Sequence, residues 1–466
     1  MSDPQPGSVG DSAAAAVCLD VGSCWTKAVF VHPDGSPAGF AEHPTTPDVL
    51  DGVDAAVAAA AASAGRGARS APDVLACSSA GGALRLVVVG AEQLASVEAG
   101  HQVARSAGAR VVGVHSGPLE PDGVRELAGQ RPGVVLLIGG ADGDDPAVLL
   151  HNAGRLARTR GRYPVLLAGN ATARDDAVGL LRAGGRTVTA CANVVPRPGE
   201  IVPGPARREV AELYARHVLG AGGDAGRFSA LARTRTPLAV AAGAAALARL
   251  AGTGVLVVDV GSATTDVHQA LPAGATEPDP ALMTVEGDLG VRAGAEGVLI
   301  EAQTEGVVDP VEADLLAPTV AALVSSGPAV PGDRGAAAED RRLAAVAAVV
   351  ALRRHLRHTD RMAISGFGGF GGFGPTASGP SGAVPGPDAD RDIGLVVLTG
   401  GVFRQRDPAG LAAAAATVHR DPVLMGPLTQ VDVRVDSGSV LAPAGLLVRH
   451  GREAAARALL AEQLLG

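Results

Sequence analysis

The stretch VCLDVGSCWTKAVFVHPDG, residues 17–35, contains the only lysine of the chain, Lys27, and its only tryptophan, Trp25. It begins with an apolar run and continues, after a Gly-Ser pair, into a second apolar run at 28–32. Two such β-type runs around a short glycine-containing segment predict a hairpin. Asp20 lies at the end of the first strand, so a carboxylate and an ammonium group flank one turn.

The same pattern occurs again later in the chain. DVGSCWT at 20–26 recurs as DVGSATT at 259–265, and both copies follow an apolar strand. A second pair of segments, LLIGG at 136–140 and VVLTGG at 396–401, ends a predicted strand in two glycines. Two matches in the same order predict an internal duplication.

Elsewhere the chain alternates between predicted helices and strands, most regularly over residues 53–168, which is typical of an α/β fold. We therefore expect a disordered tail at 1–16, a first domain at 17–232 and a second domain at 233–466. Residues 366–390 form a Gly-, Pro- and Phe-rich insertion of low complexity, for which a surface loop is expected.

The composition limits the possible functions. The 466 residues carry a net charge of −9, which gives no basic footprint for nucleic acid. The Ala-rich runs are too short to span a bilayer, and the N-terminus lacks the basic start of a signal peptide. The four cysteines have neither CxxC nor Cys/His spacing, which favours a reducing compartment. We expect a cytoplasmic protein that binds neither membranes nor nucleic acid.

The duplicated hairpins suggest a phosphate site. A Gly- and Ser-rich turn directs backbone N–H groups into one concavity that can hold phosphate oxygens. If Asp20 and Asp259 face each other, a cation between them would relieve their repulsion, and Mg²⁺ prefers a few carboxylates together with the phosphates of a substrate. Lys27 would then serve as a point charge on those phosphates. Ordinary turns and a solvated surface lysine are the alternative interpretation.

The single lysine excludes other phosphate-binding classes. A P-loop requires the sequence GxxxxGK[ST], and a protein kinase requires a strand lysine together with HRD and DFG motifs. The chain has no GxxxxGK[ST] sequence, and it has no DFG to complete a kinase set, although HRD occurs once at 419–421.

Further segments resemble one family in particular. The hairpins and the late Gly-Gly resemble the actin/Hsp70/sugar-kinase superfamily, and within it the MutL family associated with glutamate mutase. The resemblance extends over about 15–450, although Ser262 stands where the family usually has a second glycine. The matching segments are SSAGGALRLVVVG (78–90), GGADGDD (139–145), LLAGN (166–170), NVVPRPGEI (193–201), RTPLAV (235–240), VDVGSATTDVH (258–268), VEGDLGVR (285–292) and TGGVF (399–403).

The resemblance implies two RNase H-like domains, related by duplication, that close on ATP and Mg²⁺. It also implies an ATP-dependent chaperone, with weak ATPase activity, that reactivates an adenosylcobalamin-dependent mutase by allowing cofactor exchange. Asp20 and Asp259 would orient Mg²⁺, and Asp142 or Asp266 would activate water. The implied nucleotide-binding residues are Gly22, Ser23, Thr26 and Lys27 in the first hairpin, Gly261, Ser262, Thr264 and Thr265 in the second, and Gly400 and Gly401 near adenosine.

Three other functions fit the same fold. A small-molecule kinase would turn over ATP only with a metabolite, and a hydantoinase-type enzyme shares a similar second hairpin. A non-catalytic, actin-like scaffold would self-associate on ATP without a mutase.

Overall fold

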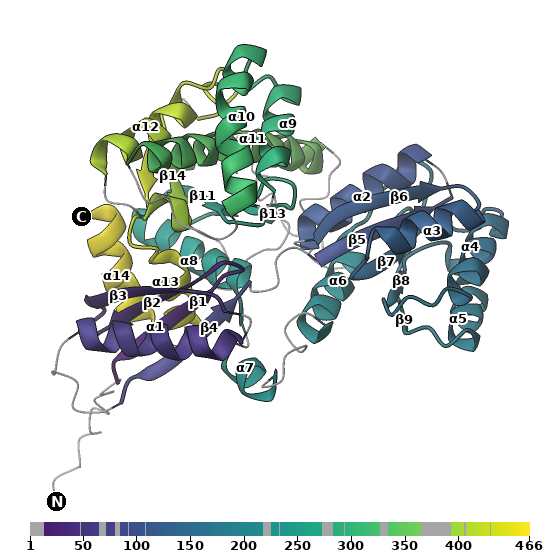
Figure 1. Cartoon of the computed structure of the whole chain (residues 1–466), viewed down its shortest axis with the longest axis horizontal. Helices are drawn as coiled ribbons and strands as arrows, with labels where there is room; N and C mark the ends of the chain where they lie inside the picture. Colours follow the sequence, from purple (N-terminus) through teal and green to yellow (C-terminus); the bar gives the residue numbers. More distant parts are fainter. Residues whose placement is uncertain are drawn as a thin grey trace, which may run out of the picture.

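The computed structural model describes residues 14–46, 48–64, 71–79, 84–91, 93–107, 109–217, 225–232, 234–272, 283–292, 294–326, 334–364, 393–404, 407–428 and 430–466. Most of the expected tail (1–13) and the whole insertion at 366–390 lie outside these residues. The predicted α/β class is confirmed, because the described strands form three five-stranded sheets with helices packed around them (Figure 1). Within the described ranges, no helix combines the length and the apolar character needed to cross a membrane.

The N-terminal sheet has the strand order β10-β4-β1-β2-β3. Strands β1, β2 and β3 form an antiparallel meander, whereas β4 runs parallel to β1 and β10 runs parallel to β4. The register of the first hairpin places Asp20 opposite Lys27. The strands are β1 (Ala16–Val21), β2 (Trp25–Val31), β3 (Pro37–Pro44), β4 (Asp73–Ser78) and β10 (Thr234–Arg235).

The C-terminal sheet repeats this arrangement in the order β13-β12-β11-β14-β15. Its hairpin and third strand are antiparallel, and the two remaining strands are parallel. Asp259 lies opposite Asp266, the positions that correspond to Asp20 and Lys27. The strands are β11 (Gly254–Val260), β12 (Thr265–Ala270), β13 (Met283–Glu286), β14 (Ile393–Thr399) and β15 (Asp432–Val435).

The equal topology agrees with two related domains, and the duplication itself stays a prediction. The match between the two Gly-Gly segments, which supported the duplication, was wrong. The glycines at 400–401 follow β14, whose counterpart in the N-terminal sheet is β4. The glycines at 139–140 instead follow a strand of the third sheet.

The third sheet is entirely parallel and has the order β6-β5-β7-β8-β9. This is a doubly wound arrangement, and it occupies the chain between β4 and β10. The structure thus adds a separate parallel-sheet unit, described from 84 to 217, to the first domain expected at 17–232. Its strands are β5 (Leu84–Gly90), β6 (Ala109–Ser116), β7 (Val134–Leu137), β8 (Val165–Leu167) and β9 (Val188–Ala190), and its helices are α2 (Gln93–Ala107), α3 (Pro121–Gly129), α4 (Ala147–Ala157), α5 (Arg174–Ala183) and α6 (Gly204–His217).

Two helices form a layer between the N- and C-terminal sheets. Apolar side chains of α8 (Thr236–Ala251) and α13 (Leu441–Arg449) share one core with Cys18 and Val29 on one sheet and Val257 and Val397 on the other. The far face of the N-terminal sheet packs against α1 (Val49–Ser63) and α7 (Ala225–Leu231). The far face of the C-terminal sheet packs against α9 (Ala295–Thr304), α10 (Pro310–Ser326), α11 (Arg334–Ile364) and α12 (Pro408–His419), and α14 (Glu453–Leu460) packs beside α13.

The sequence of α8 suits this buried layer. The helix begins at Thr236 with a proline in its first turn and ends where Gly252 adopts a left-handed conformation. Its small residues allow close packing, since a Cβ atom at Gly243 would lie 2.1 Å from the carbonyl oxygen of Leu441 in α13. A Cβ atom at Gly445 would likewise lie 1.8 Å from the carbonyl oxygen of Ala239.

Replacing Gly445 by alanine should therefore force α8 and α13 apart. We expect the free energy of unfolding to fall by about 2 kcal/mol, as for other overpacked cores. Chemical denaturation of Gly179→Ala provides the control, because no atom lies within 4 Å of a Cβ atom at this position in α5. That variant should gain roughly 0.5–1 kcal/mol. Equal stability of the two variants would contradict the close packing of the helix layer.

Candidate functional site

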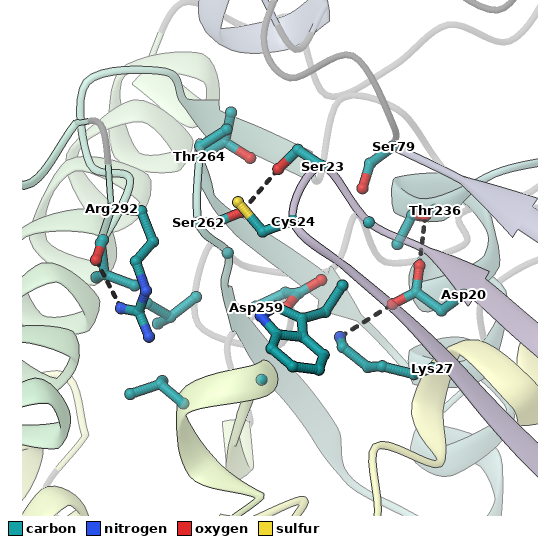
Figure 2. A pocket seen from close by; sticks show the side chains of 18 of the residues that line it. Asp20, Ser23, Cys24, Lys27, Ser79, Thr236, Asp259, Ser262, Thr264 and Arg292 are labelled. Carbon is teal, nitrogen blue, oxygen red and sulfur yellow. Dashed lines mark hydrogen bonds and ion pairs between the residues drawn. The ribbon is translucent and has the colours of Figure 1, made fainter. Parts of the chain in front are cut away.

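A pocket lies where the two hairpins meet the first turn of α8. Figure 2 shows the hairpin side chains facing one another across it. The N-terminal sheet contributes Asp20 and Lys27, the C-terminal sheet contributes Asp259 and Asp266, and α8 contributes Thr236. Of the other predicted residues, Gly22, Ser23, Gly261, Ser262, Thr264 and Gly401 also line it.

The two turns have the same local geometry. The N–H group of Gly22 donates to the carbonyl oxygen of Trp25 at 2.9 Å, and that of Gly261 donates to the carbonyl oxygen of Thr264 at 2.8 Å. A Cβ atom at either glycine would lie less than 3.0 Å from the same oxygen, at 2.7 and 2.9 Å, so a side chain would open the turn. Since these two N–H groups close the turns, they are not available to a ligand.

In the first hairpin, Asp20 and Lys27 form an ion pair. Lys27 Nζ lies 3.0 Å from Asp20 Oδ2, and Asp20 Oδ1 accepts a hydrogen bond of 2.8 Å from the hydroxyl of Thr236. Burial lowers the pKa of Lys27, but the carboxylates of Asp20 and Asp259 outweigh it and raise the pKa above its ordinary value. The lysine is therefore a firmly charged cation inside the pocket.

In the second hairpin, two acids take the places of the acid and the base. Burial raises the pKa of Asp259 to about 6; Lys27 lowers it, and the carboxylates of Asp20 and Asp436 raise it. Burial, followed by the charge of Asp259, raises the pKa of Asp266 to about 8. Asp266 therefore holds a proton at neutral pH. Its Oδ1 is buried and has no hydrogen-bond partner among the described residues.

One direct contact joins the two turns. The hydroxyl oxygens of Ser23 and Ser262 lie 2.6 Å apart, so the hairpin tips touch across the pocket (Figure 2). The contact follows from the equal geometry of the turns, because both serines directly follow the turn glycine. Ser262, the departure from the family pattern, is thus one half of this bridge.

Four predicted residues do not line the pocket, and these are Thr26, Asp142, Thr265 and Gly400. Thr26 and Thr265 are buried, and each fixes the loop behind its own hairpin: Thr26 lies 3.2 Å from the hydroxyl of Thr45, and Thr265 donates to the carbonyl oxygen of Leu289. Because side chains alternate along a strand, these threonines point away from the face that bears Lys27 and Asp266. They are structural supports for the turns.

Gly400 meets a backbone requirement. Its φ of 126° lies in a region that favours glycine, and a Cβ atom there would lie 2.2 Å from the carbonyl oxygen of Val260. Its neighbour Gly401 forms part of the pocket wall, where a Cβ atom would lie 3.8 Å from Cε of Lys27.

Asp142 lies in the parallel-sheet unit and does not line the pocket, since its Gly-Gly segment follows a strand of another sheet. Its carboxylate accepts hydrogen bonds from the N–H group of Ala171 at 2.7 Å and from the amide of Asn193 at 2.9 Å. These bonds tie together three loops at the carboxyl ends of the parallel strands.

The structure adds pocket residues that the sequence did not single out. Arg292 forms a bidentate ion pair with Asp340 of α11, at 2.7 and 2.8 Å, and its own N–H group donates to the carbonyl oxygen of Ser262. Its position after the VEGDLG segment was the available signal. The other additions include Cys24, Trp25, Glu42, Ser78, Ser79, Arg235, Thr236 and Arg404.

The donor set fits a divalent cation bound together with phosphates. Asp20 and Asp259 come from opposite sheets, and the charge of Asp20 raises the pKa of Asp259, so both carboxylates act on one small volume. The described residues contain no cluster of three or more His, Cys, Asp or Glu side chains that could hold a metal. Two carboxylates suffice for Mg²⁺ when a substrate supplies phosphate oxygens.

Comparison with known proteins places the chain in a family. Protein MutL of Clostridium tetanomorphum is 31% identical over 297 residues, which cover 60% of this chain and 64% of that protein. The match therefore spans less than two thirds of the relative.

Similar solved structures have low TM-scores. Nucleotide-free acetone carboxylase has a TM-score of 0.36 at 14% identity, covering 93% of this chain and 70% of that one. Component A of the Acidaminococcus fermentans (R)-2-hydroxyglutaryl-CoA dehydratase has a TM-score of 0.28 at 10% identity, covering 96% and 97%. Scores below 0.5 support no argument about function. The family model described as MutL protein, in contrast, matches residues 16–464, and the chain belongs to the MutL family.

Proposed function

We propose that the chain binds ATP in the pocket between the two hairpins and hydrolyses it to drive cofactor exchange in an adenosylcobalamin-dependent carbon-skeleton mutase. One observation carries the nucleotide part: two glycine turns of equal geometry, from different sheets, bring Asp20, Lys27, Asp259 and Asp266 into one pocket. Membership of the MutL family supports a mutase of the glutamate mutase type as the client.

The first hairpin would supply the positive charge. Lys27 is held in place by Asp20, and its raised pKa keeps the ammonium group charged whether or not a phosphate is bound. Asp20 and Asp259 are the residues that would hold Mg²⁺, which supplies electrostatic stabilisation of phosphate charge when it is bound. An ammonium group is compact, whereas a guanidinium group at this site would be bulkier and planar.

The second hairpin would supply the general base, through the fraction of Asp266 that is ionised near its pKa of about 8. A general base works best when its pKa lies near the operating pH, and burial and the charge of Asp259 raise the pKa of Asp266 into this region. Asp266 lines the pocket, and its buried Oδ1 has hydrogen-bonding capacity that no described residue uses. Asp142 is a poorer candidate, because both of its hydrogen bonds lie within the parallel-sheet unit.

Lys27→Ala and Asp20→Ala should each abolish ATP hydrolysis, because the first removes the cation and the second removes a cation ligand and the partner of Lys27. Phosphate release measured with purified proteins and Mg²⁺ tests this. Asp142→Asn is the control, and it should retain wild-type turnover. Turnover at the wild-type rate in either alanine variant would contradict the proposal. Wild-type turnover that appears only with an added metabolite would favour the kinase instead.

The protonation of Asp266 predicts a pH-dependent stability. The carboxyl group has a pKa of 3.8 in an ordinary environment and about 8 in the folded protein, so folding takes up a proton between these pH values. The wild type should therefore lose stability as the pH rises from about 4 to about 8. Asp266→Asn removes this titration and should be increasingly more stable than the wild type over that range, with the difference constant above about pH 8. Thermal unfolding at several pH values measures it, and a difference independent of pH would count against a protonated Asp266.

The client can be tested with a mutase inactivated by hydroxocobalamin. Addition of the chain, ATP, Mg²⁺ and adenosylcobalamin should restore mutase activity, whereas the Lys27→Ala variant should not. Recovery without ATP, or equal recovery with the variant, would refute ATP-driven reactivation.

A further inference from the structure

We propose that Thr236 is a positioning residue for Asp20 and that it couples the pocket to the parallel-sheet unit, so that nucleotide binding changes the contact between α2 and β13. This inference rests on the proposed function, since it concerns the same pocket. It assigns a role to a part of the fold that the two-sheet core does not need.

The parallel-sheet unit is attached to the N-terminal sheet at one place. The chain leaves this sheet after β4 and returns to it at β10, and these two strands are hydrogen-bonded neighbours. Thr234 pairs with Cys77, and Arg235 pairs with Ser78. The exit toward the unit therefore lies beside β10, whereas the chain that follows the unit first forms α7, which packs on the far face of the sheet.

The same residues hold the acid of the first hairpin. The hydroxyl of Thr236, directly after β10, donates to Asp20 Oδ1 at 2.8 Å, and the thiol of Cys77, at the end of β4, lies 3.8 Å from this oxygen. The N–H group of Ser79 donates to the carbonyl oxygen of Val21 at 2.9 Å. The exit toward the unit and the residue that follows the neighbouring strand β10 are thus both bonded to the end of β1.

These connecting residues also form the pocket wall. Ser78 and Ser79 on the exit side, and Arg235 and Thr236 on the return side, line the cavity together with Asp20. Figure 2 shows Ser79 and Thr236 on the same side of the pocket as Asp20. A ligand there would lie beside Ser79, where the chain leaves the N-terminal sheet toward the unit.

The unit has a second attachment, on the opposite side of the pocket. Helix α2 packs against β13, the edge strand of the C-terminal sheet (Figure 1). Strand β13 is paired with β12, which carries Asp266, and Val285 of β13 lines the pocket. The unit therefore contacts both sheets between which the pocket lies.

This geometry has a mechanical consequence. If a ligand changes the separation of the two hairpins, a unit attached to both sheets must move relative to one of them. Its link to the N-terminal sheet runs through the continuous chain, whereas α2 and β13 are far apart in the sequence and meet only by tertiary contact. The second contact is therefore the one that changes.

The test compares Thr236→Val, which keeps the shape of the side chain but removes the hydroxyl, with Thr236→Ser, which keeps the hydroxyl. Amide hydrogen exchange is followed in the full chain with and without ATPγS and Mg²⁺. In the wild type and in Thr236→Ser we expect nucleotide to change the exchange rate of α2 and β13 several-fold, with α5 unaffected. In Thr236→Val this response should be lost. ATP turnover should fall about tenfold or more, as for loss of a hydrogen bond to a charged group, while KM changes little.

The outcomes separate this inference from the proposed function. If calorimetry detects nucleotide binding to the wild type but α2 and β13 exchange as before, the coupling is refuted and the function stands. If Thr236→Val gives the wild-type response, Thr236 does not carry the coupling. If the wild type binds no nucleotide, the proposed function fails and the inference falls with it.

Discussion

An imbalance of charge governs this molecule. Three carboxylates of the hairpins, Asp20, Asp259 and Asp266, share the pocket with Lys27, while the other two pocket acids, Glu42 and Asp340, are paired with Arg404 and Arg292. Burial makes every unpaired charge among the hairpin residues expensive. The protein accommodates them unequally: Asp20 is paired with the ammonium group, and the pKa values of Asp259 and Asp266 rise to about 6 and about 8. The raised pKa values indicate that Lys27 does not balance the charge of both acids, and under the proposed function a divalent cation would do so.

The register of the hairpins creates this inequality. In each hairpin, a seven-residue spacing places the last residue of the pattern directly opposite the strand-end aspartate. The first hairpin has lysine at that position and the second has aspartate, so equal backbones give an ion pair in one sheet and a repelling pair in the other. The difference between Lys27 and Asp266 at equivalent positions thus gives the first hairpin a cation and the second hairpin an additional acid.

Much of this could be predicted from the sequence. The glycines, the strand-end aspartates and Lys27 were identifiable because turn chemistry and strand periodicity are local properties, and their recurrence marked them as a pair. Thr26 and Thr265 were assigned to phosphate because their position in the motif was considered without the alternation of side chains along the strand, which points them away from the pocket. Arg292 and Thr236 were missed as pocket residues because one follows the VEGDLG segment and the other begins α8, and tertiary packing decides which such segments meet at the pocket.

The parallel-sheet unit shows the limit most clearly. The alternation of its strands and helices was predicted as far as residue 168, whereas α5 and β9 were not predicted. The predicted elements were assigned to the first domain, because periodicity does not reveal which sheet a parallel strand joins. Comparison of the two halves explains its location: the connection from β4 to β10 corresponds to the one from β14 to β15, where a single α-helix, α12, suffices. Since β4 and β10 are neighbours, a whole unit can be accommodated between them without disturbing the sheet. The same adjacency places the exit toward the unit, at Ser78 and Ser79, in the pocket wall with Asp20. The position in the sheet that tolerates the added unit is therefore also a position next to the pocket.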